Sequence, residues 1–221
     1  MKPLINLESI LETIPVHEAV LKADLLYQFR DMLLEANQRM NLISRRDETR
    51  IIERHFLDSI GLLTKIQFPL NARILDLGSG AGFPGLPLKI VRPDLELLLV
   101  EAVQKKASFL KRSVHSLKLL KTEVVCARME NVAPDIPPVD FIVSRAVASL
   151  DKVVKWGRAC VRPGGQFILI KGTDIDNELR IFEKKADTLG AKTLRYESYC
   201  PFHETGVTRK STLIFVEMGR R

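Results

Sequence analysis

The chain after residue 71 constrains the fold most, because short apolar segments there alternate with helical patterns. Strands that alternate with helices pair in parallel within one sheet, so we expect an α/β fold with helices on both faces of that sheet. Two further β-rich runs, residues 193–199 and 211–218, could pair antiparallel at the sheet edge, giving a mostly parallel sheet of seven strands. The five earlier strands are expected at residues 73–77, 95–101, 123–127, 140–144 and 166–171.

The first part of the chain has a different pattern of apolar residues. Apolar residues recur three or four apart along residues 4–63, for example Leu25, Phe29 and Leu33, and this spacing predicts helices. Asp47 is a plausible N-cap for a helix that carries Phe56 and Ile60 on one face. We therefore expect two parts, a small helical region at residues 1–70 and a Rossmann-like domain at residues 71–221.

Charge and composition narrow the class of partner and the compartment. The formal net charge is +7 and the pI is about 9.4, which favours a polyanionic partner. The three cysteines form no C-x-x-C pair, so the sequence suggests neither a disulfide framework nor a zinc ribbon. The N-terminal residues are unlike a targeting peptide, and no apolar run approaches the roughly 20 residues of a membrane span. We expect a cytoplasmic protein without membrane contact.

The strongest local signal is the run DLGSGAGFPG at residues 76–85, which follows the first strand and opens a helix. Glycines let the backbone turn sharply and approach a ligand without obstruction by a Cβ atom. A side chain at Gly78 is therefore expected to occupy space that a ligand needs. Glu101 ends the second strand, where such folds place a carboxylate that accepts hydrogen bonds from ribose hydroxyls. Together these features predict a nucleoside-containing ligand.

The spacing of the glycines distinguishes between ligands. A dinucleotide motif requires a third glycine three positions after the second, but that position is Phe83. The observed G-x-G-x-G pattern preceded by Asp76 is similar to the S-adenosylmethionine (SAM) motif of Rossmann-like methyltransferases. A Tyr-x-x-x-Lys pair for hydride chemistry and a Walker A lysine are both absent. SAM is the preferred cofactor, and a nicotinamide-dependent oxidoreductase is the less favoured alternative.

Several motifs in collinear order point to one family. They are NLI at residues 41–43, RHFLDS at 54–59, the glycine run with its Phe-Pro-Gly ending, IVRP at 90–93 and SRA at 144–146. Together they resemble the glucose-inhibited division protein B family, bacterial methyltransferases that act on guanine N7 of 16S ribosomal RNA. The likeness covers residues 37–172. It implies a class I SAM-dependent methyltransferase fold and a substrate in 16S ribosomal RNA or the small ribosomal subunit.

The resemblance also implies residues for the cofactor site. Gly78, Gly80 and Phe83 would line the site at the glycine loop, and Glu101 would accept from the ribose. Arg145, at the end of the fourth strand, occupies the family's remaining cofactor position and could orient the cofactor or the guanine. Two residues after the third strand fall where the family holds the adenine ring, Met129 and Glu130.

Candidate RNA contacts are basic residues on expected loops or strand ends near the carboxyl edge of the sheet. The histidines show no metal-ligand spacing, so no metal site is expected. Because guanine N7 has a lone pair and no proton, no catalytic base is needed and none is identified. We expect a monomer. The candidate RNA contacts are Arg45, Arg46, Lys171, Arg209 and Lys210.

Two questions stay open from the residues alone. His55 and Asp58 lie three apart on a helix and could either share a hydrogen bond that docks the helical region over the cleft or form a surface pair. The acceptor could also be a small molecule or a protein, because the same sheet supports many methyltransferases.

Overall fold

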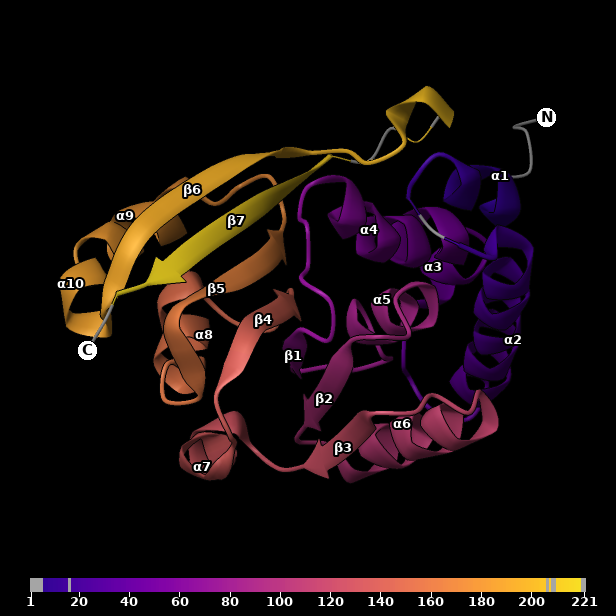
Figure 1. The fold of residues 1–221 in the computed structure, drawn as a ribbon, viewed down its shortest axis with the longest axis horizontal. Helices are drawn as coiled ribbons and strands as arrows, with labels where there is room; N and C mark the ends of the chain where they lie inside the picture. The colour runs from indigo at the N-terminus through magenta and orange to yellow at the C-terminus, as the bar shows by residue number, and fades with distance from the viewer. Residues whose placement is uncertain (1–5, 16, 206, 208–209, 220–221) are drawn as a thin grey trace.

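A computed structural model describes residues 6–15, 17–205, 207 and 210–219 of the chain. The helical region comes first and lies at one end of the molecule, beyond α5 and α6 (Figure 1). Within the described part of the chain, no helix has the length and apolar character needed to cross a membrane. The helical segments before the sheet are α1 (Leu7–Glu12), α2 (Ala19–Asn37), α3 (Arg45–Glu48), a π-helical turn (Ile52–Phe56), α4 (Leu57–Ile60) and a 3₁₀ turn (Gly61–Thr64).

A seven-stranded sheet forms the centre, with strand order β3-β2-β1-β4-β5-β7-β6. The first five strands are parallel, and β7 pairs antiparallel with both β5 and β6. The predicted mostly parallel sheet is confirmed, but β7 lies inside β6, so β6 alone forms that edge. The strands are β1 (Arg73–Leu77), β2 (Glu96–Glu101), β3 (Thr122–Cys126), β4 (Val139–Arg145), β5 (Val161–Lys171), β6 (Ala191–Tyr199) and β7 (Ser211–Met218).

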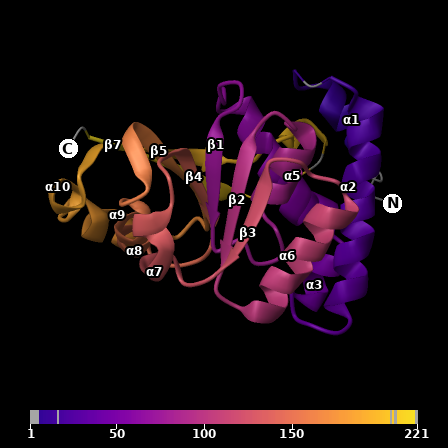
Figure 2. The ribbon, with the colours of Figure 1, turned by 60° about the horizontal axis from the view of Figure 1, so that its bottom comes forward.

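Helices cover both faces of the sheet (Figure 2). On one face lie α5 and α6, with α2 packed against both; on the other lie α7 to α10. The near-continuous apolar sequences of β1 and β2 follow from this cover, because a parallel sheet is buried on both faces. The helices after β1 are α5 (Gly85–Val91), α6 (Gln104–Ser116), α7 (Met129–Val132), α8 (Leu150–Gly157), α9 (Asp176–Glu183) and α10 (Ala186–Leu189), and short 3₁₀ turns lie at Ala133–Asp135 and His203–Thr205.

The helical region and one face of the sheet share a single hydrophobic core. Phe29 of α2 is fully buried, and its ring lies 5.6 Å from that of Phe56, 5.6 Å from that of Phe83 and 6.4 Å from that of Phe109. These rings come from α2, the π-helical turn, the glycine loop and α6. The contact between helical region and glycine loop therefore fixes one wall of whatever binds at that loop.

The expected N-cap at Asp47 is wrong. Asp47 lies inside α3, which follows Ser44, and its carboxylate accepts from the Ser44 hydroxyl at 2.8 Å and pairs with Arg54 at 2.5 Å. The expected fifth strand also begins earlier, at Val161, because the irregular pairing between Val139 and Phe141 of β4 admits the preceding residues into the strand.

Candidate functional site

A cavity of about 440 Å³ lies at the carboxyl edge of the parallel strands, between the glycine loop, the end of β2 and the β4–α8 loop. Its volume falls within the range of roughly 300–1,000 Å³ that small-molecule sites occupy. The strand order reverses between β1 and β4, and open α/β sheets bind ligands outside such a point. The cavity is bordered by Leu42, Ile43, His55, Gly78, Ser79, Gly80, Ala81, Phe83, Glu101, Ala102, Lys106, Arg145, Ala146 and Val147.

The glycine loop leaves space at one position in particular. Gly78, Gly80 and Gly82 all have positive φ angles, 73°, 55° and 98°. A Cβ atom added at Gly80 would meet only the carbonyl oxygen of Gly78, at 3.8 Å, whereas one added at Gly78 would come within 2.5 Å of Val147. A side chain at Gly78 would first strike Val147 of the β4–α8 loop, which also borders the cavity, so its effect on ligand space stays a prediction; Gly80 is the glycine with open space beside it.

Glu101 holds the glycine loop in place. Its Oε2 accepts from the backbone N–H of Gly80 at 2.8 Å, and its Oε1 accepts from that of Val103 at 2.7 Å. Each carboxylate oxygen has two lone pairs, so one remains on each oxygen for a further donor. The geometry therefore fits a ligand that presents hydroxyl donors at the cavity beside Gly80.

Asp76 lies beneath the loop with none of its surface exposed. Its Oδ2 accepts from the N–H of Gly85 at 2.9 Å, while Oδ1 has no hydrogen-bond partner among the described residues. Burial raises the pKa of Asp76 from 3.8 to about 7; the Gly85 hydrogen bond and the charge of Arg145 oppose this rise, and Glu101 adds to it. The site thus contains a buried acid that a cationic ligand would favour in its ionised form.

Arg145 crosses from the end of β4 to the helical region. Its guanidinium lies 5.0 Å from the centre of the Phe83 ring, and Nη1 donates to the carbonyl of Arg54 at 3.1 Å. Nη1 also lies 4.0 Å from Oδ2 of Asp58, which is 2% exposed. A cation held by a ring, a carbonyl and a carboxylate has little freedom, so Arg145 presents a fixed set of donors at the cavity.

The His55–Asp58 surface pair is excluded, because both residues are buried. The His55 ring stacks on Phe83 with centres 5.1 Å apart, and Nε2 lies 3.7 Å from Oδ2 of Asp47. The carbonyl of Asp58 accepts from the hydroxyl of Tyr199 at the end of β6, at 2.7 Å. The segment therefore docks the helical region over the cavity, through ring stacking, the Asp58–Arg145 pair and this tyrosine.

Met129 and Glu130 begin α7 at the same edge of the sheet but do not border the cavity. Met129 is 4% exposed and packs in the core beneath α7, and Glu130 is exposed. The preceding Ala127 donates from its backbone N–H to the carbonyl of Glu101 at 3.1 Å. The two residues predicted for the adenine site thus lie beside the end of β2, on the far side of Glu101 from the glycine loop.

The candidate RNA contacts separate into distinct environments. Arg45 and Arg46 are exposed on α3, and Lys210 is exposed before β7. Lys171 is buried: its ammonium donates to the carbonyl of Ala148 and lies 2.8 Å from Glu178. Arg209 lies outside the described residues. Lys171 is therefore already engaged in fixing the β4–α8 loop.

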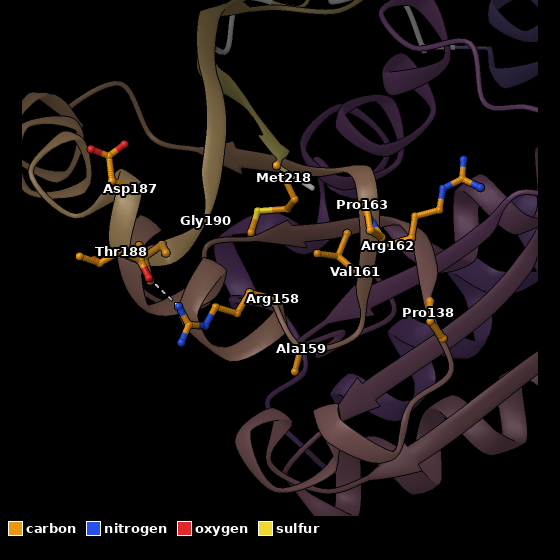
Figure 3. A pocket seen from close by; sticks show the side chains of 12 residues that line it. Pro138, Arg158, Ala159, Val161, Arg162, Pro163, Asp187, Thr188, Gly190 and Met218 are labelled. Carbon is orange, nitrogen blue, oxygen red and sulfur yellow. Dashed lines mark hydrogen bonds between the residues drawn. The ribbon is translucent and has the colours of Figure 1, made fainter. Parts of the chain in front are cut away.

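A larger cavity, of about 570 Å³, lies at the opposite edge of the sheet, where β4 and β5 begin and β7 ends (Figure 3). Its two arginines already have partners. Arg158 donates to the carbonyl of Thr188 at 2.7 Å, and Arg162 lies 2.6 Å from Asp140. The glycine loop and Glu101 are at the other edge, so we place the functional site in the smaller cavity. Among the described residues, no group of three or more His, Cys, Asp or Glu side chains could hold a metal ion.

Sequence reasoning missed the contacts that close the site from the helical side. The motif at residues 54–59 signals that this segment matters, but no local pattern shows that His55 meets Phe83 or that Asp58 meets Arg145. Lys106 and Val147 were missed as cavity residues for the same reason, since α6 and the β4–α8 loop look like ordinary amphipathic and loop segments.

Fold and site together define a class I, Rossmann-like SAM-dependent methyltransferase. A SAM-dependent methyltransferase from Aquifex aeolicus superposes with a TM-score of 0.58 at 16% identity, over 79% of this chain and 95% of that chain. TYW2 of M. jannaschii, in complex with AdoMet, superposes with a TM-score of 0.60 at 15% identity, over 83% and 80%. At such identity these structures establish the fold.

Sequence comparison identifies the family within this class. The GidB family, described as rRNA small subunit methyltransferase G, matches residues 22–203, and the chain belongs to it. Ribosomal RNA small subunit methyltransferase G of Roseiflexus castenholzii is 41% identical over 83% of this chain and 78% of its own length. The same-named protein of Streptomyces coelicolor is 35% identical over 87% and 78%. The family predicted from the sequence is confirmed, and with it a SAM-dependent methyltransferase of small-subunit ribosomal RNA.

Proposed function

We propose that this chain transfers a methyl group from SAM to N7 of one guanine in 16S ribosomal RNA, and that it acts in the cytoplasm as a monomer. The main support is the convergence of the glycine loop, Glu101 and Arg145 on one cavity of suitable size, in a chain of this family. The positive charge of +7 favours an RNA acceptor over a small molecule or a protein.

The residues of the cavity fit the cofactor. SAM, when bound, supplies a methyl group activated by a sulfonium sulfur. We assign the lone pairs left on Glu101 to the ribose hydroxyls, the open space at Gly80 to the nucleoside, and Gly78 and Phe83 to the walls beside it. Met129 and Glu130 are assigned to the adenine end, beyond Glu101. Asp76, ionised, would stabilise positive charge in the cavity above it.

The protein's contribution to chemistry is alignment. Guanine N7 carries a lone pair and no proton, so the acceptor requires no general base. Displacement at a methyl carbon needs the nucleophile in line at about 3–3.5 Å, and holding two reactants in that geometry supplies much of the rate enhancement. The restrained Arg145 suits such a role, because its donors keep one direction while the substrate enters.

We further propose that residues 1–70 serve as the wall that closes this cavity, with Arg45 and Arg46 facing RNA. The support is the burial of His55 and Asp58 against Phe83 and Arg145. The division at residue 70, and RNA contacts by Lys171, Arg209 and Lys210, stay predictions.

Transfer of labelled methyl from SAM to naked 16S ribosomal RNA and to assembled small subunits, followed by mapping of the product, tests the function. A single 7-methylguanosine is the expected result. Tight SAM binding without transfer to either RNA would refute it, and transfer to an exocyclic amine would refute the N7 assignment.

The Arg145→Lys substitution distinguishes between the two proposed roles of Arg145, which are binding the cofactor and orienting the guanine. Lysine keeps the charge but loses the planar set of donors, so we expect transfer to fall about 10- to 100-fold. A rise in the Kd of SAM measured by calorimetry would assign Arg145 to the cofactor. A lower kcat with unchanged SAM affinity would assign it to the guanine, and unchanged values of both would exclude it from the site.

A further inference from the structure

A second concave surface lies between α6 and the end of α2, separate from the cofactor cavity. Its volume is about 340 Å³. Two methionines, Met32 and Met40, supply an apolar floor over the buried Phe109. Arg39 and Arg112 stand on opposite sides, the first after α2 and the second on α6. The remaining lining residues are Ala36 and Glu35, which is the one carboxylate among them.

The two chain segments that border this groove also border the cofactor cavity. Lys106 borders the cavity, and Phe109 and Arg112, three and six residues further along α6, border the groove. On the other side, Met40 borders the groove and Leu42 borders the cavity. Figure 2 shows α2 beside α6, and residues of the two helices are in contact. Six helical residues rise about 9 Å, roughly the length of two to three stacked nucleotides.

The cationic side chains near the groove and the cofactor cavity are available to a ligand. Among the described residues, no ion pair involves the exposed side chains of Arg39, Arg45, Arg46, Lys105 and Arg112. Some exposed cations elsewhere, although not all of them, are neutralised within the protein. Arg162 pairs with Asp140, Lys185 with Asp151, and Lys192 with Glu217. Positive charge without internal partners, gathered next to the active cavity, is complementary to phosphates.

We propose that this groove binds a nucleotide of the single-stranded RNA that flanks the methylated guanine. The base would lie against Met32 and Met40, whose polarizable thioethers suit contact with an aromatic face. The phosphates on either side of that base would meet Arg39 and Arg112, and Glu35 could accept from an amino group on the base edge. The inference rests on the proposed function, because it requires that the acceptor be RNA.

The test compares two double variants that remove the same charge. Arg39→Gln with Arg112→Gln alters the groove, and Arg180→Gln with Lys184→Gln alters exposed cations of α9 and its end, on the opposite face. Methyl transfer to naked 16S ribosomal RNA is measured at several salt concentrations, together with SAM affinity and thermal stability. All four side chains are exposed, so both variants should fold.

We expect the groove variant to raise KM for RNA about tenfold with kcat and SAM affinity unchanged, and the control to change KM less than twofold. The salt dependence of kcat/KM should weaken by about 1.4 in log–log slope, from about 0.7 for each lost phosphate contact on a single strand. Equal effects of both variants, or none from either, would overturn the proposal. Normal kinetics on naked RNA with slow methylation of assembled subunits would assign the groove to a protein partner instead. A wild-type protein that binds SAM but methylates no RNA would refute the underlying function.

Discussion

The two edges of the sheet each carry a cavity, and the larger cavity is the less suited to chemistry. At the amino edge, polar groups satisfy one another. Arg158 donates to the Thr188 carbonyl (Figure 3), and the carboxylate of Asp140 pairs with Arg162 and accepts from the N–H of Arg73 at 2.7 Å. At the carboxyl edge, Asp76 keeps an oxygen without a hydrogen-bond partner among the described residues. A buried polar atom that lacks a hydrogen-bond partner, more than the volume of the cavity, distinguishes the functional edge of the sheet.

Backbone direction explains this difference. At the carboxyl edge, strands β1 and β2 lead into the N-termini of α5 and α6, where backbone N–H groups are left over for side chains and ligands. The amino-edge cavity is bordered by Arg158 and Gly190, the residues that end α8 and α10, where carbonyls are left over. One of the carbonyls at the end of α10, that of Thr188, accepts from the guanidinium of Arg158. If chemistry is confined to the carboxyl edge, substitutions there should impair SAM binding and matched substitutions at the amino edge should not.

The largest difference between the two edges is expected when a glycine with a positive φ angle is replaced by leucine at each edge and SAM affinity is measured. Gly80→Leu sends a side chain into the carboxyl-edge cavity, and we expect SAM affinity to fall more than a thousandfold, over about 4 kcal/mol. Gly190→Leu is the matched control, because Gly190 has φ 76° and its Cβ would meet only Met218, at 3.7 Å.

Both leucines adopt the left-handed region at a similar cost, about 1–2 kcal/mol of stability. Calorimetry with SAM and thermal unfolding check the pair. Equal loss of SAM binding in both variants would show that backbone strain, and not occupation of the cavity, decides affinity. Normal binding in a folded Gly80→Leu protein would remove the cofactor from this edge.

Asp76 predicts a pH dependence of stability that comes from the carboxyl edge. The folded pKa, about 7, is above the unfolded value of 3.8, so the folded state binds the proton more tightly. The contribution of Asp76 to stability is therefore greatest below pH 3.8 and falls as pH rises toward 7.

Between pH 5 and pH 7 this fall amounts to about 2 kcal/mol for a fully buried group. Asp76→Asn keeps an oxygen for the Gly85 N–H and removes the titration. Urea unfolding of both proteins at half-unit intervals of pH gives the difference in unfolding free energy. As pH rises from 5 to 7, the unfolding free energy of Asp76→Asn should increase relative to that of the wild type by the amount given above. A difference between the two proteins that does not change with pH would contradict the raised pKa of Asp76.

The sequence was most informative where local pattern decides structure. The strands at residues 73–77 and 211–218 have the predicted bounds, because short apolar runs ended by glycine or polar residues leave little choice of element. The glycine loop was located for the same reason. Its finer geometry was not predicted: only the path of the β4–α8 loop shows that Val147 covers Gly78 and leaves Gly80 open.

Long-range contacts account for what the sequence could not show. The apolar spacing after Ile51 predicts a regular helix with one apolar face, yet the segment contains a π-helical turn and buries His55 and Asp58 as well. Its partners, Phe83, Arg145 and Tyr199, lie 28 to 141 residues away along the chain. Lys171 looked like a free cation at a strand end, and only the fold brings Glu178 to it.

The smallest expected change in SAM affinity comes from substituting the glutamates at the two ends of one strand. Glu101 ends β2 at the carboxyl edge, and Glu96 begins it at the amino edge, opposite Arg73 in register. Glu101→Gln retains one acceptor oxygen but replaces the other by an amide group, which cannot accept from the N–H of Gly80 or Val103. We expect SAM affinity to fall about tenfold, or about 1.4 kcal/mol, because a ribose acceptor and a loop contact are weakened together.

Glu96→Gln should change the affinity less than twofold in the same calorimetric titration. Equal effects would show that the net charge of the strand matters and its end does not. An unchanged affinity in Glu101→Gln would reduce Glu101 to a support for the loop, with no part in binding the ribose.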